Sequence, residues 1–179
     1  MPTKEQCLEL LQRYQPDWDF RHVQLVGRIA RFLAEKLCDS GEDVNVKLAA
    51  SAGLLHDIGR KPNSSNVATH HSDGAKILRK EGFPEIAQIA EKHALLEILI
   101  NPPSTWEEKI VFYADKRATD NKIVSLQERF DYFIKRYGSL SAELKKQIER
   151  AKPKVLKLEK EIFNKLKIDK DLRELHEEK

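Results

Sequence analysis

Apolar residues recur every three or four positions along much of the chain, and residues with helix-capping chemistry stand between the apolar runs. Thr3 and Gln6 have the spacing of a capping box, which predicts a first helix that reaches about Tyr14. Pro16-Asp17 is then expected to open a longer helix that carries His22 in its early turns. The apolar positions of that helix are Val23, Val26, Ile29, Ala30, Leu33 and Leu37.

Capping residues also separate the apolar runs in the middle of the chain. A helix capped by Asn45 is expected to end at His56-Asp57, and residues 59–66 are expected to form a loop. A helix over residues 72–80 should end at Gly82, a residue type that accepts a left-handed C-terminal position, and Pro84 should start the next one. Two more capping boxes are predicted, at Ser104 with Glu107 and at Ser125 with Glu128. Because strand alternation is scarce and no repeat is found, the chain is predicted to be an all-α helical bundle.

Residues 141–179 differ from the rest of the chain, since they are dense in Lys and Glu and carry only a sparse apolar stripe. The stripe comprises Leu144, Ile148, Val155, Leu158, Ile162 and Leu166. We therefore expect a main domain over residues 1–140 and a charged helical extension over residues 141–179 that packs one narrow face on it. Pro153 should kink or interrupt this helix. A homodimer contact is the alternative use of the stripe, and a nucleic-acid surface is disfavoured because acidic residues alternate with the basic ones.

Composition indicates an ordinary cytoplasmic domain. The net charge of +3 is too small to argue for nucleic acid. Cys7 and Cys38 lack the spacing of a redox or zinc motif, which favours free thiols in a reducing compartment. The N-terminus lacks the apolar core of a signal peptide, and no stretch approaches the length of a membrane span.

The doublet His56-Asp57 is the strongest chemical signal. A buried carboxylate costs several kcal/mol unless it is paired or binds a cation, and the residues before Asp57 are apolar. An isolated pair of this kind is more often a helix end, in which the His caps carbonyls and the Asp is solvated. This pair is accompanied by other nitrogen and oxygen ligands beside apolar helices, of the kind that suit zinc, iron or manganese. They are His22, His70, His93 and Asp115.

A helix-borne His, a His-Asp doublet and a later Asp, here His22, His56-Asp57 and Asp115, resemble the pattern of the HD-domain metal-dependent phosphohydrolases. The doublet continues as Ile58-Gly59, the form that names the HDIG subgroup, and the resemblance runs from about residue 21 to 138. Residues 114–130 are also similar to a segment of stand-alone HDIG proteins. The resemblance implies a helical HD-type domain and one metal held by His22, His56, Asp57 and Asp115.

Two more histidines resemble the additional ligands of family members with a dinuclear site. His70 precedes Gly74-Ala75 by four residues, and His93 ends an apolar helical run. The resemblance implies that these two hold a second metal, with Asp57 as the bridge, as in the HD-domain diadenosine tetraphosphate hydrolases. The Gly-Tyr-Pro motif of HD-domain cyclic dinucleotide phosphodiesterases is absent, and His71 is given no ligand role.

Such a metal pair would supply hydroxide near neutral pH and stabilise charge on phosphate. The expected activity is therefore hydrolysis of a nucleotide or another small phosphorylated substrate, with Asp57, Arg60 and Asp115 as catalytic residues. Arg60 is the favoured phosphate ligand because of its planar fork, followed by Lys61, Lys116 and Arg117. The residue types do not distinguish Fe, Mn, Zn, Co, Ni and Mg.

Two alternatives keep the same fold. Some HD-domain proteins resemble this chain in their ligands but use a di-iron pair to activate oxygen. A nucleotide-binding regulatory module without turnover is the second alternative. No serine or cysteine nucleophile competes, because Ser51 lacks the glycines of a nucleophile elbow.

Overall fold

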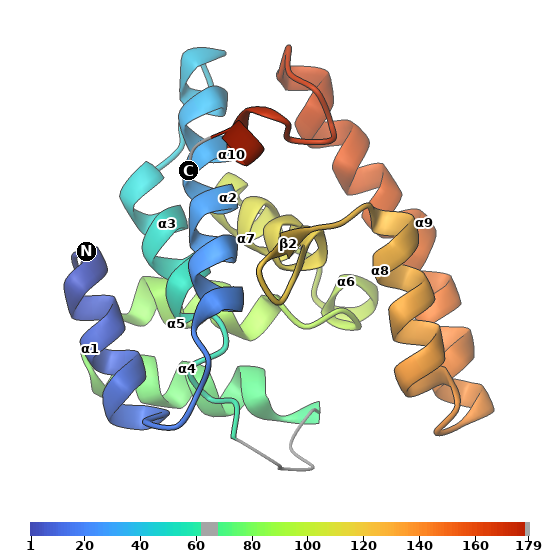
Figure 1. Cartoon of the computed structure of the whole chain (residues 1–179), viewed down its shortest axis with the longest axis horizontal. Helices are drawn as coiled ribbons and strands as arrows, with labels where there is room; N and C mark the ends of the chain where they lie inside the picture. Colours follow the sequence, from blue (N-terminus) through green and yellow to red (C-terminus); the bar gives the residue numbers. More distant parts are fainter. Residues whose placement is uncertain (62–67, 178–179) are drawn as a thin grey trace.

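The computed structural model describes residues 1–61 and 68–177, and this part of the chain is almost entirely helical (Figure 1). The α-helices are α1 (Lys4–Tyr14), α2 (Arg21–Asp39), α3 (Val46–Leu55), α4 (His70–Lys80), α5 (Pro84–Lys92), α6 (Glu97–Ile100), α7 (Trp106–Arg117), α8 (Leu126–Phe133), α9 (Ala142–Lys165) and α10 (Glu174–Glu177), with a π-helical turn η2 (Ile134–Gly138) after α8. Two short antiparallel strands, β1 (Ala118–Thr119) and β2 (Lys122–Ile123), are paired with Ala118 opposite Ile123. The all-α prediction is confirmed.

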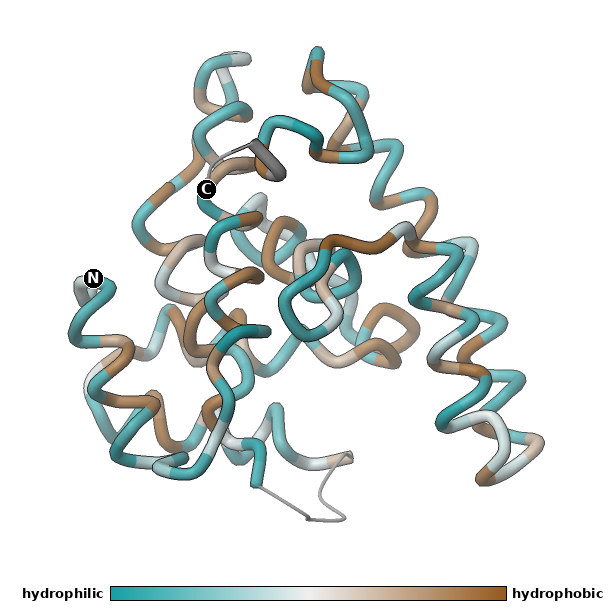
Figure 2. The backbone as a smooth tube through the Cα atoms, in the orientation of Figure 1, coloured by the Kyte–Doolittle hydropathy of each residue, from teal (hydrophilic) through white to brown (hydrophobic). Residues whose placement is uncertain are grey.

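The core is built around α2, α3 and α7, which contact one another at the centre of the molecule. Figure 2 shows apolar positions gathered on these central helices, whereas α9 alternates polar and apolar positions along its length. A Cβ atom on Gly53 would lie 2.9 Å from the Cα of Gly27, so these two glycines allow α3 to approach α2 closely. This approach places the end of α3 beside the first turns of α2.

Several predicted helix ends are correct. Thr3 with Gln6 and Ser125 with Glu128 form capping boxes, and the Asn45 side chain accepts a hydrogen bond from the Leu48 amide. Gly82 has a φ of +86°, and Pro84 is the first residue of α5. The local hydrogen-bonding chemistry of these residues is sufficient to fix the ends of their helices.

Other helix ends differ from the prediction. Helix α2 begins at Arg21 rather than at Pro16, because the Asp19 carboxylate accepts hydrogen bonds from both the amide and the side chain of Arg21 and so ends the preceding turn there. Helix α4 begins at His70, two residues before the expected start. The capping box before α7 consists of Thr105 and Glu108, one residue later than predicted. Of the expected loop over residues 59–66, residues 62–66 lie outside the described part of the chain.

Helix α9 runs through Pro153 without interruption, so the predicted interruption is wrong, while a kink at Pro153 stays a prediction. Pro153 is exposed, so the carbonyl group that loses its intrahelical partner can be hydrated. The opposite face is buried through Ile148, Ala151, Val155, Leu158, Ile162 and Phe163. It contacts α6, α7 and α8, and Figure 1 shows α8 and α9 side by side along one edge of the molecule.

None of the helices in the described part of the chain has the length and apolar character needed to cross a bilayer.

Candidate metal centre

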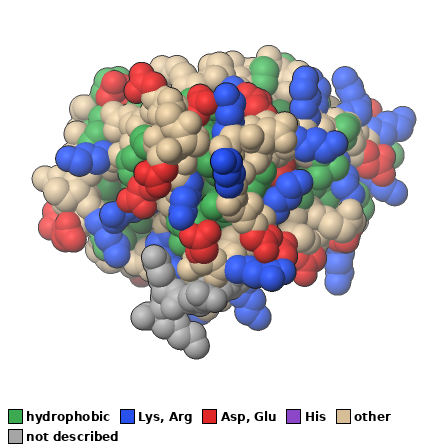
Figure 3. Space-filling model, turned by 90° about the horizontal axis from the view of Figure 1, so that it is seen from above, with side chains coloured by type: hydrophobic (Ala, Val, Ile, Leu, Met, Phe, Trp, Pro, Cys, Tyr) green, Lys and Arg blue, Asp and Glu red, His purple; other side chains and the backbone are tan. Residues whose placement is uncertain are grey.

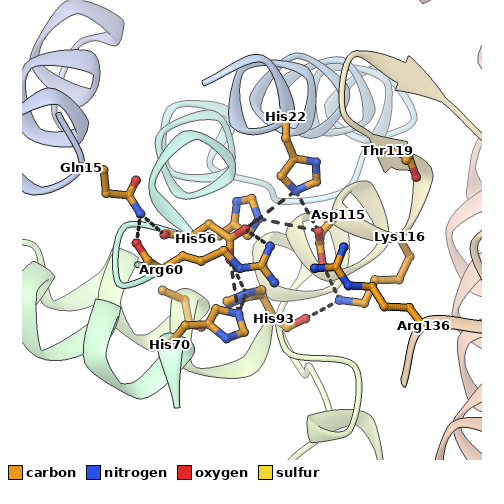
Figure 4. A network of polar contacts seen from close by, with 12 residues as sticks. Gln15, His22, His56, Arg60, His70, His93, Asp115, Lys116, Thr119 and Arg136 are labelled. Carbon is orange, nitrogen blue, oxygen red and sulfur yellow. Dashed lines mark hydrogen bonds and ion pairs between the residues drawn. The ribbon is translucent and has the colours of Figure 1, made fainter. Parts of the chain in front are cut away.

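Six side chains predicted as metal ligands converge on one place, although they come from five separate parts of the fold, and Figure 4 labels five of them. His22 lies in the first turn of α2, and Asp115 lies in the last turn of α7. His56-Asp57 follows α3, His70 begins α4, and His93 follows α5. All are buried except His22, whose side chain is 17% exposed. The site is therefore assembled from helix ends rather than from a loop.

One group of three side chains surrounds Asp115. Its Oδ1 atom lies 3.2 Å from His22 Nε2 and 3.7 Å from His56 Nε2. The ligand atoms of these three residues all lie within 4.8 Å of one another, which is close enough for a single metal ion to contact them all. Two imidazole nitrogens and a carboxylate oxygen suit a divalent transition metal.

A second group surrounds Asp57 and shares His56 with the first. Asp57 Oδ1 lies 3.2 Å from His93 Nε2 and 3.3 Å from His70 Nε2, and Asp57 Oδ2 lies 3.6 Å from His56 Nε2. The ligand atoms of His56, Asp57 and His93 again fall within 4.8 Å of one another. The residues thus form two adjoining clusters that could hold metal, and because His56 Nε2 has a single lone pair, only one of them can use His56 when both are occupied.

Two of the histidines are held in the tautomer that a metal requires. His56 Nδ1 lies 2.8 Å from the Gly53 carbonyl oxygen, and His93 Nδ1 lies 2.6 Å from that of Ala90. Since a carbonyl only accepts, each Nδ1 carries a hydrogen, and Nε2 is the nitrogen that offers a lone pair in the neutral ring. This second interaction also fixes the plane of each ring.

Two of the candidate ligand atoms have no proton donor in the part of the chain that the structure describes, although His70 Nε2 lies within hydrogen-bond distance of His93 Nε2 and His22 Nε2 within that of Asp115 Oδ1. Among the described residues, the buried His56 Nε2 and Asp57 Oδ1 atoms have no hydrogen-bond partner. Buried acceptors without donors are costly, and a cation between them would remove the cost. The residues present therefore fit a bound metal ion.

Electrostatics favour positive charge at the same point. Burial alone would raise the pKa of Asp57 and Asp115, but their charged and hydrogen-bonding neighbours lower both pKa values well below the usual range. Burial also opposes protonation of His56, yet the two carboxylates raise its pKa. Burial lowers the pKa of His93 to about 3, so this imidazole is neutral at physiological pH. The carboxylates are thus ionised and His93 is ready to act as a ligand.

The candidate phosphate-binding residues near the doublet, Arg60 and Lys61, are both accessible to solvent but differ in their contacts. Arg60 Nη1 lies 3.2 Å from Asp57 Oδ2, and its side chain is 31% exposed, so it remains accessible beside the cluster. Lys61 is exposed. His71, which was given no ligand role, lies with its Nε2 3.7 Å from a carboxylate oxygen of Glu97.

Lys116 and Arg117 are not available to a substrate in the way that the sequence prediction expected. The Lys116 amino group is buried, lies 2.6 Å from Asp115 Oδ2 and donates to the carbonyl of His93, and burial lowers its pKa. Arg117 donates to the carbonyls of Val124 and Lys170. Lys116 therefore contacts two of the candidate ligands, and Arg117 connects the residue after β2 and the C-terminal segment to α7.

Two residues at the site were not singled out from the sequence. The Gln15 side chain, buried after α1, donates to the carbonyls of Asp57 and Arg60 at 2.8 and 2.6 Å and so holds the doublet turn. Arg129 of α8 reaches Asp115, with Nη2 3.7 Å from Oδ1. A single Gln between helices gives no signal, whereas Arg129 belongs to the segment that resembles HDIG proteins.

Helix α4 packs so closely against residue 59, two positions after Asp57, that only a glycine fits there. A Cβ atom at this position would lie 2.2 Å from both the Gly74 amide nitrogen and the His70 carbonyl oxygen. Helix α4 can therefore bring His70 to Asp57 only because residue 59 has no side chain.

The Gly59→Ala variant should push α4 away from the doublet. We expect it to lower the free energy of unfolding by about 1–3 kcal/mol, as overpacking does, and to reduce metal bound through His70. Urea unfolding and metal analysis measure the two effects. Gly138→Ala is the control, because the nearest atom to its added Cβ would be 3.4 Å away. Unchanged stability and metal content in Gly59→Ala would contradict the close approach.

Comparison with known proteins agrees with this geometry. A family model described as HD domain matches residues 19–120, which contain all six candidate ligands. The chain is 34% identical over 157 residues to the uncharacterized protein MJ0778 of Methanocaldococcus jannaschii, an alignment that covers 80% of this chain and 92% of that protein. No solved structure matches the chain significantly.

Two further relatives are longer proteins. The chain is 33% identical over 150 residues to a tRNA (cytidine(56)-2'-O)-methyltransferase of Thermoplasma volcanium, covering 76% of this chain. It is 32% identical over 148 residues to the protein of the same name from Picrophilus torridus, covering 74% of this chain. The chain spans only 42% and 41% of the length of these two proteins. The family match and the clustered histidines and aspartates together show that the chain belongs to the HD-domain family, whose members are typically metal-dependent hydrolases.

Proposed function

We propose that this chain is a metal-dependent phosphohydrolase that cleaves a phosphoester or phosphoanhydride bond in a nucleotide or a related small substrate. The observation that carries the proposal is the pair of adjoining ligand clusters that share His56. Among the described residues, two of their buried acceptor atoms, His56 Nε2 and Asp57 Oδ1, lack the donors that a structural hydrogen-bond network would supply. The HDIG form of the doublet and the His70 and His93 pair support a place in the dinuclear branch that resembles diadenosine tetraphosphate hydrolases.

In this proposal His22, His56, Asp57 and Asp115 hold one divalent ion, and Asp57, His70 and His93 hold the second. Bound divalent ions supply a water of lowered pKa and positive charge beside the phosphate oxygens. Asp115, fixed by Lys116 at 2.6 Å, orients the attacking water, and Arg60 binds a phosphate oxygen. Gln15 fixes the backbone between Asp57 and Arg60 by donating hydrogen bonds to the carbonyl groups of both residues.

One face of the molecule lacks the charge pattern expected of a nucleic-acid surface. On the face shown in Figure 3, basic and acidic side chains are intermixed rather than segregated. Nucleic-acid binding draws most of its affinity from continuous positive surfaces. Since two relatives carry the name of a tRNA methyltransferase, the test substrates should nevertheless include nucleotides with 2'- and 3'-phosphates.

The proposal is tested with anaerobically purified protein whose metals are identified and then restored. The metal-loaded protein is incubated with a panel of phosphoesters and dinucleoside polyphosphates, and released phosphate and oxygen consumption are both measured. Phosphate release that stops on addition of a chelator supports the proposal. Oxygen consumption without phosphate release would favour the di-iron oxygenase, and tight nucleotide binding without either reaction would favour the regulatory module.

A further inference from the structure

The guanidinium group of Arg129 lies on the Asp115 side of the candidate metal centre and makes few hydrogen bonds to the described residues. Its side chain is 11% exposed. Nη1 donates to the Thr119 hydroxyl at 3.0 Å, and Nη2 lies 3.7 Å from Asp115 Oδ1, which is too long for a hydrogen bond. Nε is fully buried and has no hydrogen-bond partner among the described residues. A charged group with five N–H donors therefore makes one hydrogen bond in this part of the structure.

Its position is fixed by packing rather than by ion pairing. The guanidinium stacks over the rings of Phe133, at 4.7 Å from the centroid, and Tyr132, at 5.5 Å. Stacking of this kind holds the planar fork of an arginine while leaving its edge free to bind a carboxylate or phosphate. The edge that carries Nη2 faces Asp115.

In the metal-bound site, the Asp115 carboxylate has no oxygen left to accept hydrogen bonds from Arg129. Its Oδ2 atom already pairs with Lys116 at 2.6 Å, and its Oδ1 atom is the one that lies nearest His22 and His56. In the proposed function that oxygen belongs to the metal ion. A guanidinium that is 11% exposed beside a metal-bound carboxylate is then best paired with another anion.

Arg60 occupies the equivalent place at the other carboxylate. It reaches Asp57 from the turn after α3, whereas Arg129 reaches Asp115 from α8, so the two arginines approach the two carboxylates from different parts of the fold. Lys116 lies between the Asp115 carboxylate and the His93 carbonyl and is committed to both. Arg60 and Arg129 are thus described residues beside the two carboxylates that retain donors for a ligand.

We propose that Arg129 is a phosphate-binding residue, which holds non-bridging oxygens of the substrate's phosphate together with Arg60. This inference rests on the proposed function, since it assigns a residue to the same site. It extends the substrate contacts beyond the doublet loop to α8, a helix outside the matched residues 19–120.

The test uses inorganic phosphate as the probe and calorimetry on the metal-loaded full chain. Arg129→Gln should weaken phosphate binding by about 10- to 100-fold, the effect of losing charged hydrogen bonds. Arg129→Lys should recover part of the affinity, because it restores the charge but not the fork. The control is Arg150→Gln, which removes an exposed arginine of α9. Metal content and thermal unfolding are measured for each variant.

Phosphate affinity of Arg129→Gln within twofold of the wild-type value would overturn the assignment. So would a loss of metal that accounts for the loss of phosphate, since Arg129 would then act only through Asp115. Should Arg129→Gln fail to fold, Arg129→Lys and Thr119→Val carry the test, because the first removes the planar fork and the second removes the hydroxyl that the guanidinium donates to. Wild-type protein that binds phosphate through Arg129 but hydrolyses no phosphoester would refute the proposed function and leave the phosphate site standing.

Discussion

Asp57→Ala should remove metal and activity together. Asp57 is the candidate bridge, with one oxygen beside His70 and His93 and the other beside His56. Its loss should therefore weaken the binding of both ions and lower the hydrolytic rate by about 1,000-fold or more. This corresponds to several kcal/mol of transition-state stabilisation by the metal ions. Elemental analysis after dialysis and phosphate release measure the two quantities.

Two further variants separate bridging from general damage. His70→Ala removes a ligand of the second cluster alone and should leave about one ion per chain. Asp39→Ala removes an exposed carboxylate at the end of α2 and should change neither quantity. An Asp57→Ala protein with an unchanged metal content would refute the ligand assignment. A fully loaded wild-type protein with a single ion would refute the dinuclear version.

Lys116→Met should strongly destabilise the metal-free protein. The lysine is fully buried, pairs with Asp115 Oδ2 at 2.6 Å, lies over the Phe112 ring and donates to the His93 carbonyl. Removing one partner of a buried pair leaves an uncompensated charge and costs about 3–5 kcal/mol. Urea unfolding in the presence of a chelator measures this loss.

Metal should restore part of that stability, because a cation at Asp115 replaces the missing charge and binds only the folded state. Lys145→Met is the matched control, since Lys145 forms an exposed pair with Glu149 and such pairs contribute little. A Lys116→Met protein as stable as the control would show that the Lys116 pair does not support the site.

The sequence predicted the longer helices and the six residues that converge, but not α6, α10, the π-helical turn or the two short strands. Helix caps such as Thr3 and Asn45 act through hydrogen bonds within three residues, so their effect is visible locally. The ligands were recognisable because His and Asp at the ends of apolar helices are costly without a cation, and because their order along the chain resembles a known family. Their role as ligands remains a prediction that the variants above test.

The supporting residues could not be predicted, because their roles depend on contacts between distant segments. Whether Lys116 or Arg117 faces a substrate depends on what packs around the end of α7, and both side chains are taken up by carbonyl groups of other segments. Gln15 acts on residues more than 40 positions away. The cost of a close approach at Gly59 likewise becomes visible only when α4 is placed against it.

The most direct test of the central claim is the fate of solvent oxygen during turnover. Metal-loaded protein is incubated with its best phosphoester in water enriched in ¹⁸O, alongside Asp57→Ala and chelator-treated samples. The account predicts that the wild-type protein releases a phosphorus-containing product carrying oxygen from water, and that the other two samples release none. Turnover that consumes oxygen gas without labelling phosphate, or equal labelling in the chelator-treated sample, would contradict it.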